Sequence, residues 1–124
     1  MHDHDSIRAA LRAKPGAVET FPFDATTLVA KVEGKLFALL PLTALPVQLS
    51  LKVDPGYGEV LRETYSAIQP GYHLNKQHWI TLTLDGSLEP ALVQSLIDES
   101  YRLVVRGLPR AARTRLAAPP DAAG

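Results

Sequence analysis

The chain is most regular in one short segment, which reads Val47-Gln48-Leu49-Ser50-Leu51-Lys52-Val53. Every odd-numbered position in it carries an aliphatic side chain, whereas the even-numbered positions carry Gln48, Ser50 and Lys52. Successive side chains of a β-strand point to opposite faces of the sheet, so this period of two indicates a strand with one buried and one exposed face. Half-buried strands of this kind are typical of antiparallel sheets.

Further strand patterns lie on both sides of this segment. Residues 26–33 and 35–42 are rich in aliphatic side chains, and Glu33-Gly34 between them is typical of a tight hairpin turn. The second of these strands is apolar on both faces. Residues 79–84 alternate again and predict a fourth strand. Because neighbouring strands with short connections pair antiparallel, we expect one antiparallel sheet.

Three helices are predicted around these strands. Asp5 or Ser6 is expected to cap a short amphipathic first helix, which Pro15-Gly16 stops. Asp54-Pro55 is typical of a helix start, since aspartate accepts a hydrogen bond from the first turn and proline suits the first helical position. Ser87 is expected to cap the longest helix, over residues 88–108.

The predicted order is therefore α-β-β-β-α-β(β)-α, an α+β domain with helices mainly on one face of the sheet. The other face is then only partly covered. We expect it to show a mixture of apolar, basic and hydroxyl side chains: Val29, Lys31, Phe37, Leu39, Gln48, Ser50, Lys52, Trp79, Thr81 and Thr83. Such a mixture suits contact with a ligand or a partner.

The chain has 124 residues, which fits one domain, and its composition of 46% hydrophobic and 21% charged residues is that of an ordinary globular protein. We expect a single domain over residues 1–110. From residue 111 the chain consists largely of alanine, arginine and proline, without apolar periodicity. Residues 111–124 are therefore expected to form a disordered tail.

Composition excludes several classes of function. The chain has no cysteine, so disulfide scaffolds, thiolate zinc sites and iron–sulfur clusters are excluded. It carries no glycine-rich phosphate-binding motif, no nucleophile elbow and no His-Glu-x-x-His, so we expect neither an enzyme nor a cofactor. The 13 basic and 13 acidic residues cancel, which speaks weakly against a dedicated nucleic-acid binder, although residues 102–115 contain five arginines and no acid.

The N-terminal region predicts no export and no metal site. Residues 2–5, His-Asp-His-Asp, are polar and do not resemble a signal peptide, and no apolar run is long enough to cross a bilayer. We therefore expect a soluble, cytoplasmic protein that does not bind membranes. His2 and His4 form a tract that binds metals adventitiously at best, because a mobile terminus loses entropy when it coordinates an ion.

The densest polar cluster is the run Pro70-Gly71-Tyr72-His73-Leu74-Asn75-Lys76-Gln77-His78-Trp79. His73 and His78 are candidates for acid–base chemistry, Lys76 for anion binding and Trp79 for stacking on a base. A structural interpretation stays open as well, since Pro-Gly forms turns and a tryptophan at a strand start commonly packs in the core. Two histidines without a carboxylate at a fixed helical spacing make a poor metal site.

At this cluster the sequence resembles the MmcQ/YjbR-like family. The matching stretches cover roughly residues 7–110: Pro15-Gly16, Phe21-Pro22-Phe23, Thr27-Leu28-Val29-Ala30-Lys31-Val32, Lys35-Leu36-Phe37-Ala38-Leu39, Ser50-Leu51-Lys52-Val53-Asp54-Pro55, residues 70–79, Leu84-Asp85-Gly86-Ser87-Leu88, Ile97-Asp98-Glu99-Ser100-Tyr101 and Leu108-Pro109. The resemblance implies a two-layer α+β sandwich similar to secretion-chaperone-like and frataxin-like folds. It also implies DNA binding, on the ground of fold similarity to a double-wing DNA-binding domain. Frataxin-type iron binding is not carried over, because it needs an acidic first helix and this one carries Arg8 and Arg12.

The leading hypothesis is a non-enzymatic module that binds nucleic acid, with DNA as the candidate partner. The residues expected to contact phosphates and bases are Lys52, Lys76, His78, Trp79, Arg102 and Arg106. One alternative is a protein-interaction or chaperone-like homodimer that buries Phe37, Leu39 and Trp79 of the open sheet face against a partner. Another is a small-molecule binder at the His73/His78 loop.

Overall fold

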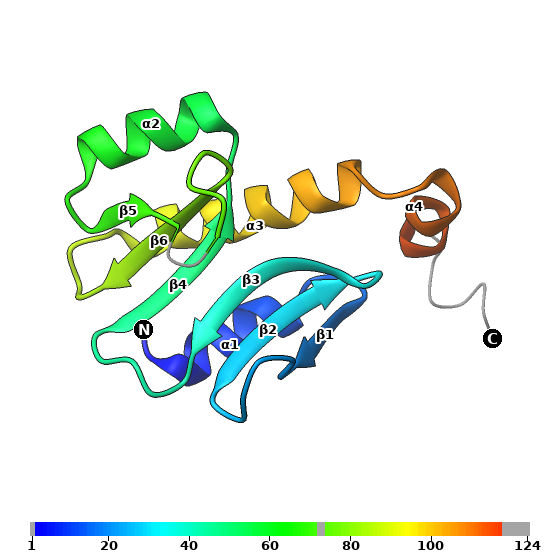
Figure 1. Cartoon of the computed structure of the whole chain (residues 1–124), viewed down its shortest axis with the longest axis horizontal. Coiled ribbons are helices and arrows are strands. Elements are labelled where there is room, and N and C mark those ends of the chain that lie inside the picture. The colour runs from blue at the N-terminus through cyan, green and yellow to red at the C-terminus, as the bar shows by residue number, and fades with distance from the viewer. Residues whose placement is uncertain (1, 72–73, 118–124) are drawn as a thin grey trace.

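The computed structural model describes residues 2–71 and 74–117. In these residues the chain forms one six-stranded sheet and four helices (Figure 1). The elements in chain order are α1 (His4–Arg12), β1 (Ala17–Thr20), β2 (Thr27–Val32), β3 (Lys35–Pro41), β4 (Val47–Lys52), α2 (Pro55–Thr64), β5 (Ile68–Pro70), β6 (Trp79–Leu84), α3 (Pro90–Arg106) and α4 (Arg110–Ala117).

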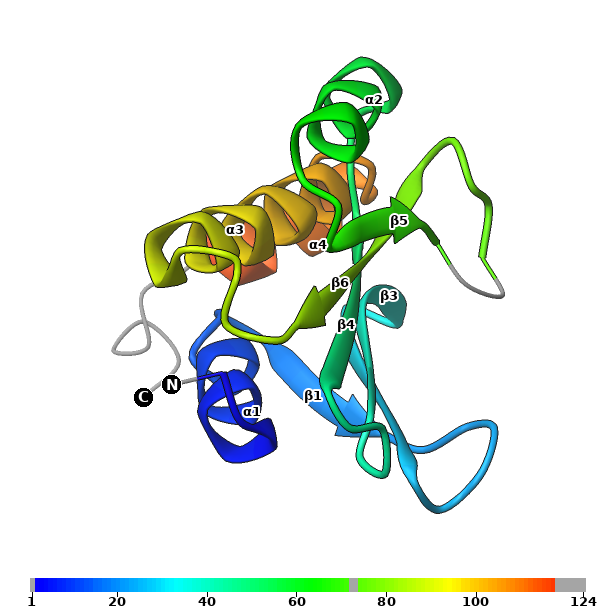
Figure 2. The same cartoon turned by 90° about the vertical axis from the view of Figure 1, so that its left-hand side faces the viewer.

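The strands lie in the order β1-β2-β3-β4-β6-β5, and every neighbouring pair is antiparallel. Helices α1 and α3 cover one face of this sheet, whereas the loop after β1 and residues 74–78 before β6 extend on the other side (Figure 2). Helix α2 packs beside β5 and β6. The predicted α+β class, with an antiparallel sheet and helices mainly on one face, is confirmed.

The core lies between the sheet and α3. The alternation in β4 places Leu49 and Leu51 in this core, where both side chains are fully buried, and Leu96 and Ile97 of α3 pack in the same cluster. Across the strand pair, Leu49 lies opposite Leu82 and Leu51 opposite Ile80, so β4 and β6 present one continuous apolar face to the helix. Burial of this face stabilises the fold by about 25 cal/mol for each Å² of apolar surface removed from water.

Strand β3 carries a bulge that overturns one prediction. Ala30 pairs with Ala38, but Lys31 pairs with Leu36, so Phe37 is an extra residue without a partner in β2. A bulge changes the direction in which the following side chains point. Phe37 was expected on the open face, yet it is fully buried on the helix side, where its ring meets Tyr101 of α3 edge to face at 5.4 Å.

The sheet is nearly divided between β3 and β4. Among the described residues these strands share two paired positions, Ala38 with Leu51 and Leu39 with Ser50. Beyond them, the buried hydroxyl of Ser100 in α3 takes the place of direct strand pairing. It donates to the Phe37 carbonyl at 2.6 Å and accepts from the Lys52 amide at 2.8 Å. A helix side chain therefore joins the two halves of the sheet.

Several element boundaries differ from the predictions. Strand β1 was not predicted, and β5 lies inside a region expected to be a loop or a second short strand. Asp3, and not Asp5 or Ser6, caps α1, because its carboxylate accepts from the Ser6 amide at 2.7 Å. Ser87 does not cap α3, which begins at Pro90, and instead bonds to Asp85 in a turn.

Two predicted boundaries agree with the structure. Asp54 caps α2 and accepts a hydrogen bond from the Gly56 amide at 3.1 Å, and Pro55 occupies the first helical position. Glu33 and Gly34 both have positive φ angles, 48° and 79°, as a two-residue hairpin turn with a primed geometry requires.

The C-terminal segment differs from the predicted tail. A disordered tail was expected from residue 111, but Arg110–Ala117 forms α4. Ala112 is buried, Leu116 packs against the core, and Arg115 forms an ion pair with Glu33. The absence of a long apolar stripe concealed this helix, because two apolar side chains four residues apart, Ala112 and Leu116, suffice to dock it. Residues 118–124 of the predicted tail lie outside the described residues.

Candidate functional site

Lys52 and Trp79 lie opposite each other at the end of the β4–β6 pair. Both side chains are partly exposed. The backbone of Trp79 is held by Gly71, whose amide donates to the Trp79 carbonyl at 2.8 Å. Any side chain at Gly71 would place its Cβ 2.5 Å from the Cβ of Trp79, so glycine is needed for this approach. The structure therefore brings together two of the six residues predicted for nucleic-acid binding.

The turn that precedes β6 presents two more of them. Asn75 shapes this turn, because its side chain accepts from the Gln77 amide at 2.9 Å and from the His78 amide at 3.3 Å. The His78 carbonyl accepts from the Val53 amide at 2.8 Å and so ties the turn to β4. Lys76 and His78 are both exposed. His73, the other candidate histidine, lies outside the described residues.

A cavity of about 220 Å³ brings Lys52 and His78 together with Arg106, from the last turn of α3. Asp54 and Leu103 also line it, whereas Lys76 and Trp79 do not. The carboxylate of Asp54 is already engaged as the cap of α2. This small concave surface therefore combines two cations and an imidazole with one acid.

Lys35 extends this group, although the sequence had not singled it out. It lines a second cavity, of about 290 Å³, together with Lys52. Among the described residues, Lys35, Lys52 and Arg106 form no ion pair within 4.0 Å. We call Lys35, Lys52, His78 and Arg106 the basic cluster. Lys35 could have been found from its place directly after the hairpin turn, since β3 runs beside β4.

Arg102 does not share this environment. It forms an ion pair with Glu99 one turn earlier in α3, and its Nε lies 3.1 Å from the carboxylate. The hydrogen bond from Arg102 lowers the pKa of Glu99, and the same contact raises the pKa of Arg102. The charge of Arg106, one turn further on, also lowers the pKa of Glu99, but Arg106 forms no ion pair within 4.0 Å among the described residues and so contributes more to an anion site than Arg102.

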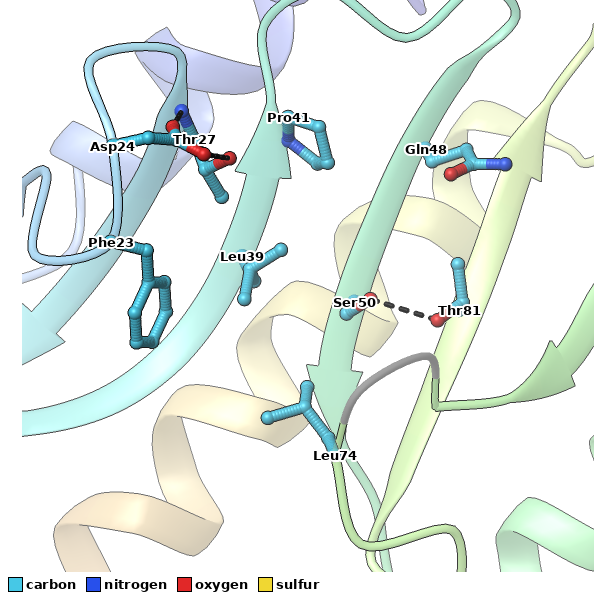
Figure 3. A pocket seen from close by; sticks show the side chains of 9 residues that line it. All are labelled: Phe23, Asp24, Thr27, Leu39, Pro41, Gln48, Ser50, Leu74 and Thr81. Atoms are coloured by element: carbon cyan, nitrogen blue, oxygen red, sulfur yellow. Dashed lines mark hydrogen bonds between the residues drawn. The ribbon is translucent and has the colours of Figure 1, made fainter.

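A larger cavity, of about 550 Å³, lies on the open face of the sheet (Figure 3). Its lining comes from β2, β3, β4 and β6 and from the loops after β1 and β5. Ser50 and Thr81 lie at its floor, and their hydroxyl oxygens are 2.8 Å apart. We call this the open-face pocket. No sequence motif indicated it, because it forms where β3 and β4 diverge.

Residues 2–71 and 74–117 contain no cluster of three His, Asp or Glu side chains that could hold a metal ion. In the same residues no helix is both long and apolar enough to cross a membrane.

The fold and the site together define a class of protein. It is an antiparallel α+β domain with a divided sheet, helices on one face and a basic cluster at one end. Residues 12–103 match the model of the YjbR family. Protein YjbR of Escherichia coli K12 is 40% identical over 104 residues, which cover 84% of this chain and 88% of YjbR. Protein YbdF of Escherichia coli O157:H7 is 33% identical over 114 residues, 91% of this chain and 93% of YbdF. The chain belongs to the YjbR family.

Solved structures agree with this assignment. The crystal structure of Deinococcus radiodurans protein DR2400 has a TM-score of 0.89 and 45% sequence identity, over 96% of this chain and 91% of that one. The crystal structure of a Pseudomonas syringae protein has a TM-score of 0.71 and 27% identity, over 82% and 97% of the two chains. The predicted family and its two-layer architecture are thus confirmed.

Proposed function

We propose that this protein binds nucleic acid without sequence preference, and that the basic cluster contacts the phosphate groups of the strand. One observation carries the proposal: Lys35, Lys52 and Arg106 come from three different elements, form no ion pair among the described residues and line two cavities that share Lys52. Unpaired cations that gather on one surface attract phosphate, and phosphate neutralisation supplies most of the affinity of non-specific binders.

Two neighbours of the cluster suit the same ligand. Trp79 is the cross-strand partner of Lys52, and its partly exposed ring can stack on an unpaired base. Lys76 lies exposed in the turn that carries His78 and adds a cation nearby in the sequence. Single strands expose both phosphates and base faces, so we expect single-stranded DNA to bind more tightly than a duplex of the same length.

The homodimer alternative loses part of its basis. It assigned Phe37, Leu39 and Trp79 to an interface, but Phe37 is fully buried against α3 inside the same chain. A partner therefore cannot contact its ring while the domain remains folded.

Fluorescence anisotropy with a labelled oligonucleotide at several salt concentrations tests the proposal. With three phosphate contacts, the slope of log K against log salt should be about −2 to −3. Lys35→Ala, Lys52→Ala and Arg106→Ala should each weaken binding and reduce the steepness of this slope by about one. The control is Arg12→Ala on α1, which removes one positive charge from a residue that lines neither cavity of the basic cluster.

The control defines the outcome that contradicts the proposal. At physiological salt the Debye length is about 8 Å, so Arg12→Ala should leave the affinity nearly unchanged. If Arg12→Ala weakens binding as much as the three cluster variants, the interaction is a general charge effect and the basic cluster is not a site. If no binding is seen at low salt with protein in large excess, the nucleic-acid proposal is wrong.

A further inference from the structure

The open-face pocket has the size and position of a small-molecule site. Its volume of about 550 Å³ lies within the range of roughly 300–1,000 Å³ that is usual for ligand cavities in proteins. It lies between Phe23 and Asp24 of the loop after β1 and Leu74 of the segment before β6, on the side of the sheet away from α3 (Figures 2 and 3). It shares no lining residue with the two cavities of the basic cluster.

The walls of the pocket are apolar. Phe23, Leu39, Pro41 and Leu74 line it from three elements of the chain. Phe23 is 69% exposed, an unusual environment for a large aromatic ring. A ligand that covers this ring removes apolar surface from water, and a flat ring can also stack on it in an offset or edge-to-face arrangement.

The polar groups in the pocket suit an uncharged ligand. Asp24 is its one charged lining residue among those described, and the amides and hydroxyls of Thr26 and Thr27 already occupy the Asp24 carboxylate. The backbone hydrogen bond from Thr26, with others from Thr27, lowers the pKa of Asp24, so this side chain stays ionised at neutral pH. Among the described lining residues, an anionic ligand would therefore meet a negative charge and no cation.

Gln48 supplies the group that can recognise a ligand edge. Its side chain lines the pocket from β4 and forms no hydrogen bond with the other described residues. A primary amide presents one acceptor and two donors side by side, so it pairs well with a ring edge that carries a donor next to an acceptor. Figure 3 shows the Gln48 side chain directed from β4 toward β6, with the hydroxyls of Ser50 and Thr81 next to each other further along the same two strands.

We propose that the open-face pocket binds a small, uncharged, flat heteroaromatic compound whose edge carries an adjacent hydrogen-bond donor and acceptor. The ring lies against Phe23 and Leu39, and the polar edge faces Gln48. This site is separate from the basic cluster and does not depend on the proposed binding of nucleic acid.

Two probes with the same ring and different charge test this proposal. Nicotinamide is neutral and carries an amide edge, whereas nicotinate carries a carboxylate. Titration of the isotope-labelled full chain, followed by amide chemical shifts, should show saturable shifts in β4, β6 and the loop after β1 with nicotinamide. Nicotinate should bind at least several-fold more weakly, because it meets Asp24 and finds no counter-charge among the described lining residues.

Gln48 is partly exposed and Phe23 is exposed, so both positions allow variants that keep the fold. Gln48→Ala and Phe23→Ala should each weaken nicotinamide binding roughly three- to tenfold, the loss expected for one hydrogen bond or one ring contact. The matched control is Phe21→Ala, since Phe21 is 42% exposed, lies in the same loop and does not line the pocket. Phe21→Ala and Lys52→Ala should both leave nicotinamide binding unchanged.

Three results would overturn the assignment. The first is the absence of saturable shifts with millimolar nicotinamide, and the second is shifts that lie outside the pocket. The third is an equal loss of binding in Phe21→Ala and Phe23→Ala, which would mean that loop conformation and not ring contact controls the affinity. Loss of oligonucleotide binding in Lys52→Ala with intact nicotinamide binding would show that the two sites are independent.

Discussion

The hydroxyl of Ser100 is expected to contribute more to stability than that of Ser95, the other serine of α3. It is fully buried and holds the Phe37 carbonyl and the Lys52 amide, at 2.6 and 2.8 Å, where β3 and β4 no longer pair directly. Ser100→Ala removes both hydrogen bonds at once. A buried polar group left without a partner costs about 1–3 kcal/mol.

The two groups are not equally sheltered, and this sets the magnitude. The Phe37 carbonyl belongs to a fully buried residue, whereas Lys52 is partly exposed, so water can reach its amide more easily. We therefore expect Ser100→Ala to lower the free energy of unfolding by about 2 kcal/mol, most of it from the carbonyl. For a domain of this size that corresponds to a fall in melting temperature of about 8 °C.

Urea denaturation measures the loss, and Ser95→Ala on the same helix is the matched control. Ser95 is exposed and donates to the Leu92 carbonyl at 2.8 Å, so its removal should cost less than about 0.5 kcal/mol. Hydrogen exchange adds a local test, because the Lys52 amide should lose protection in Ser100→Ala beyond the change in global stability. Equal losses in the two variants, with unchanged relative exchange at Lys52, would refute the bridging role.

Three further perturbations test other contacts of the fold. Asp54→Ala removes the cap of α2 and should cost about 1 kcal/mol in urea denaturation, with Asp54→Asn costing less; equal large losses would contradict the capping role. Burial raises the pKa of Glu19, but hydrogen bonds from two arginines of α1 outweigh it and hold this pKa below its ordinary value of 4.5. The stability that Glu19 contributes is therefore complete above pH 4.5 and is lost as the pH falls through the lowered pKa. Glu19→Gln should flatten the dependence of the free energy of unfolding on pH in acid. An unchanged pH dependence would contradict the ion pairs. Leu116→Ala should cost about 1–2 kcal/mol and Ala117→Ser close to nothing, whereas equal melting temperatures would mean that α4 adds no packing energy.

The sequence predicted the parts of the fold in which one local pattern dominates. The period of two in residues 47–53 was sufficient to place β4 and its buried face, and Asp54-Pro55 was sufficient to start α2. The prediction from sequence failed where a strand has no such alternation. Residues 35–42 are apolar on both faces, so nothing in their order shows that a bulge turns Phe37 toward the helix.

The candidate site was predictable only in part, because it depends on contacts between distant elements. The positions of Lys52 and Trp79 on one face of the sheet follow from strand alternation and antiparallel pairing. Arg102 and Arg106 look alike in the sequence, and the structure shows that Glu99 forms a direct ion pair with Arg102 but acts on Arg106 only at longer range. Lys35 joins Lys52 because β3 lies beside β4, a neighbourhood that charge patterns do not encode.

Two features of β3 explain why the same divided sheet holds both sites. Regular pairing beyond Leu39 and Ser50 would place the Cα atoms of Pro41 and Gln48 opposite each other at about 5 Å and would fill the open-face pocket. Proline prevents this pairing, because it has no amide hydrogen to donate to the neighbouring strand. At the other end, the bulged Phe37 gives its carbonyl to α3 and not to β4. The strands therefore diverge at both ends of two central pairs, with the apolar pocket at one end and Lys52 free to approach α3 at the other.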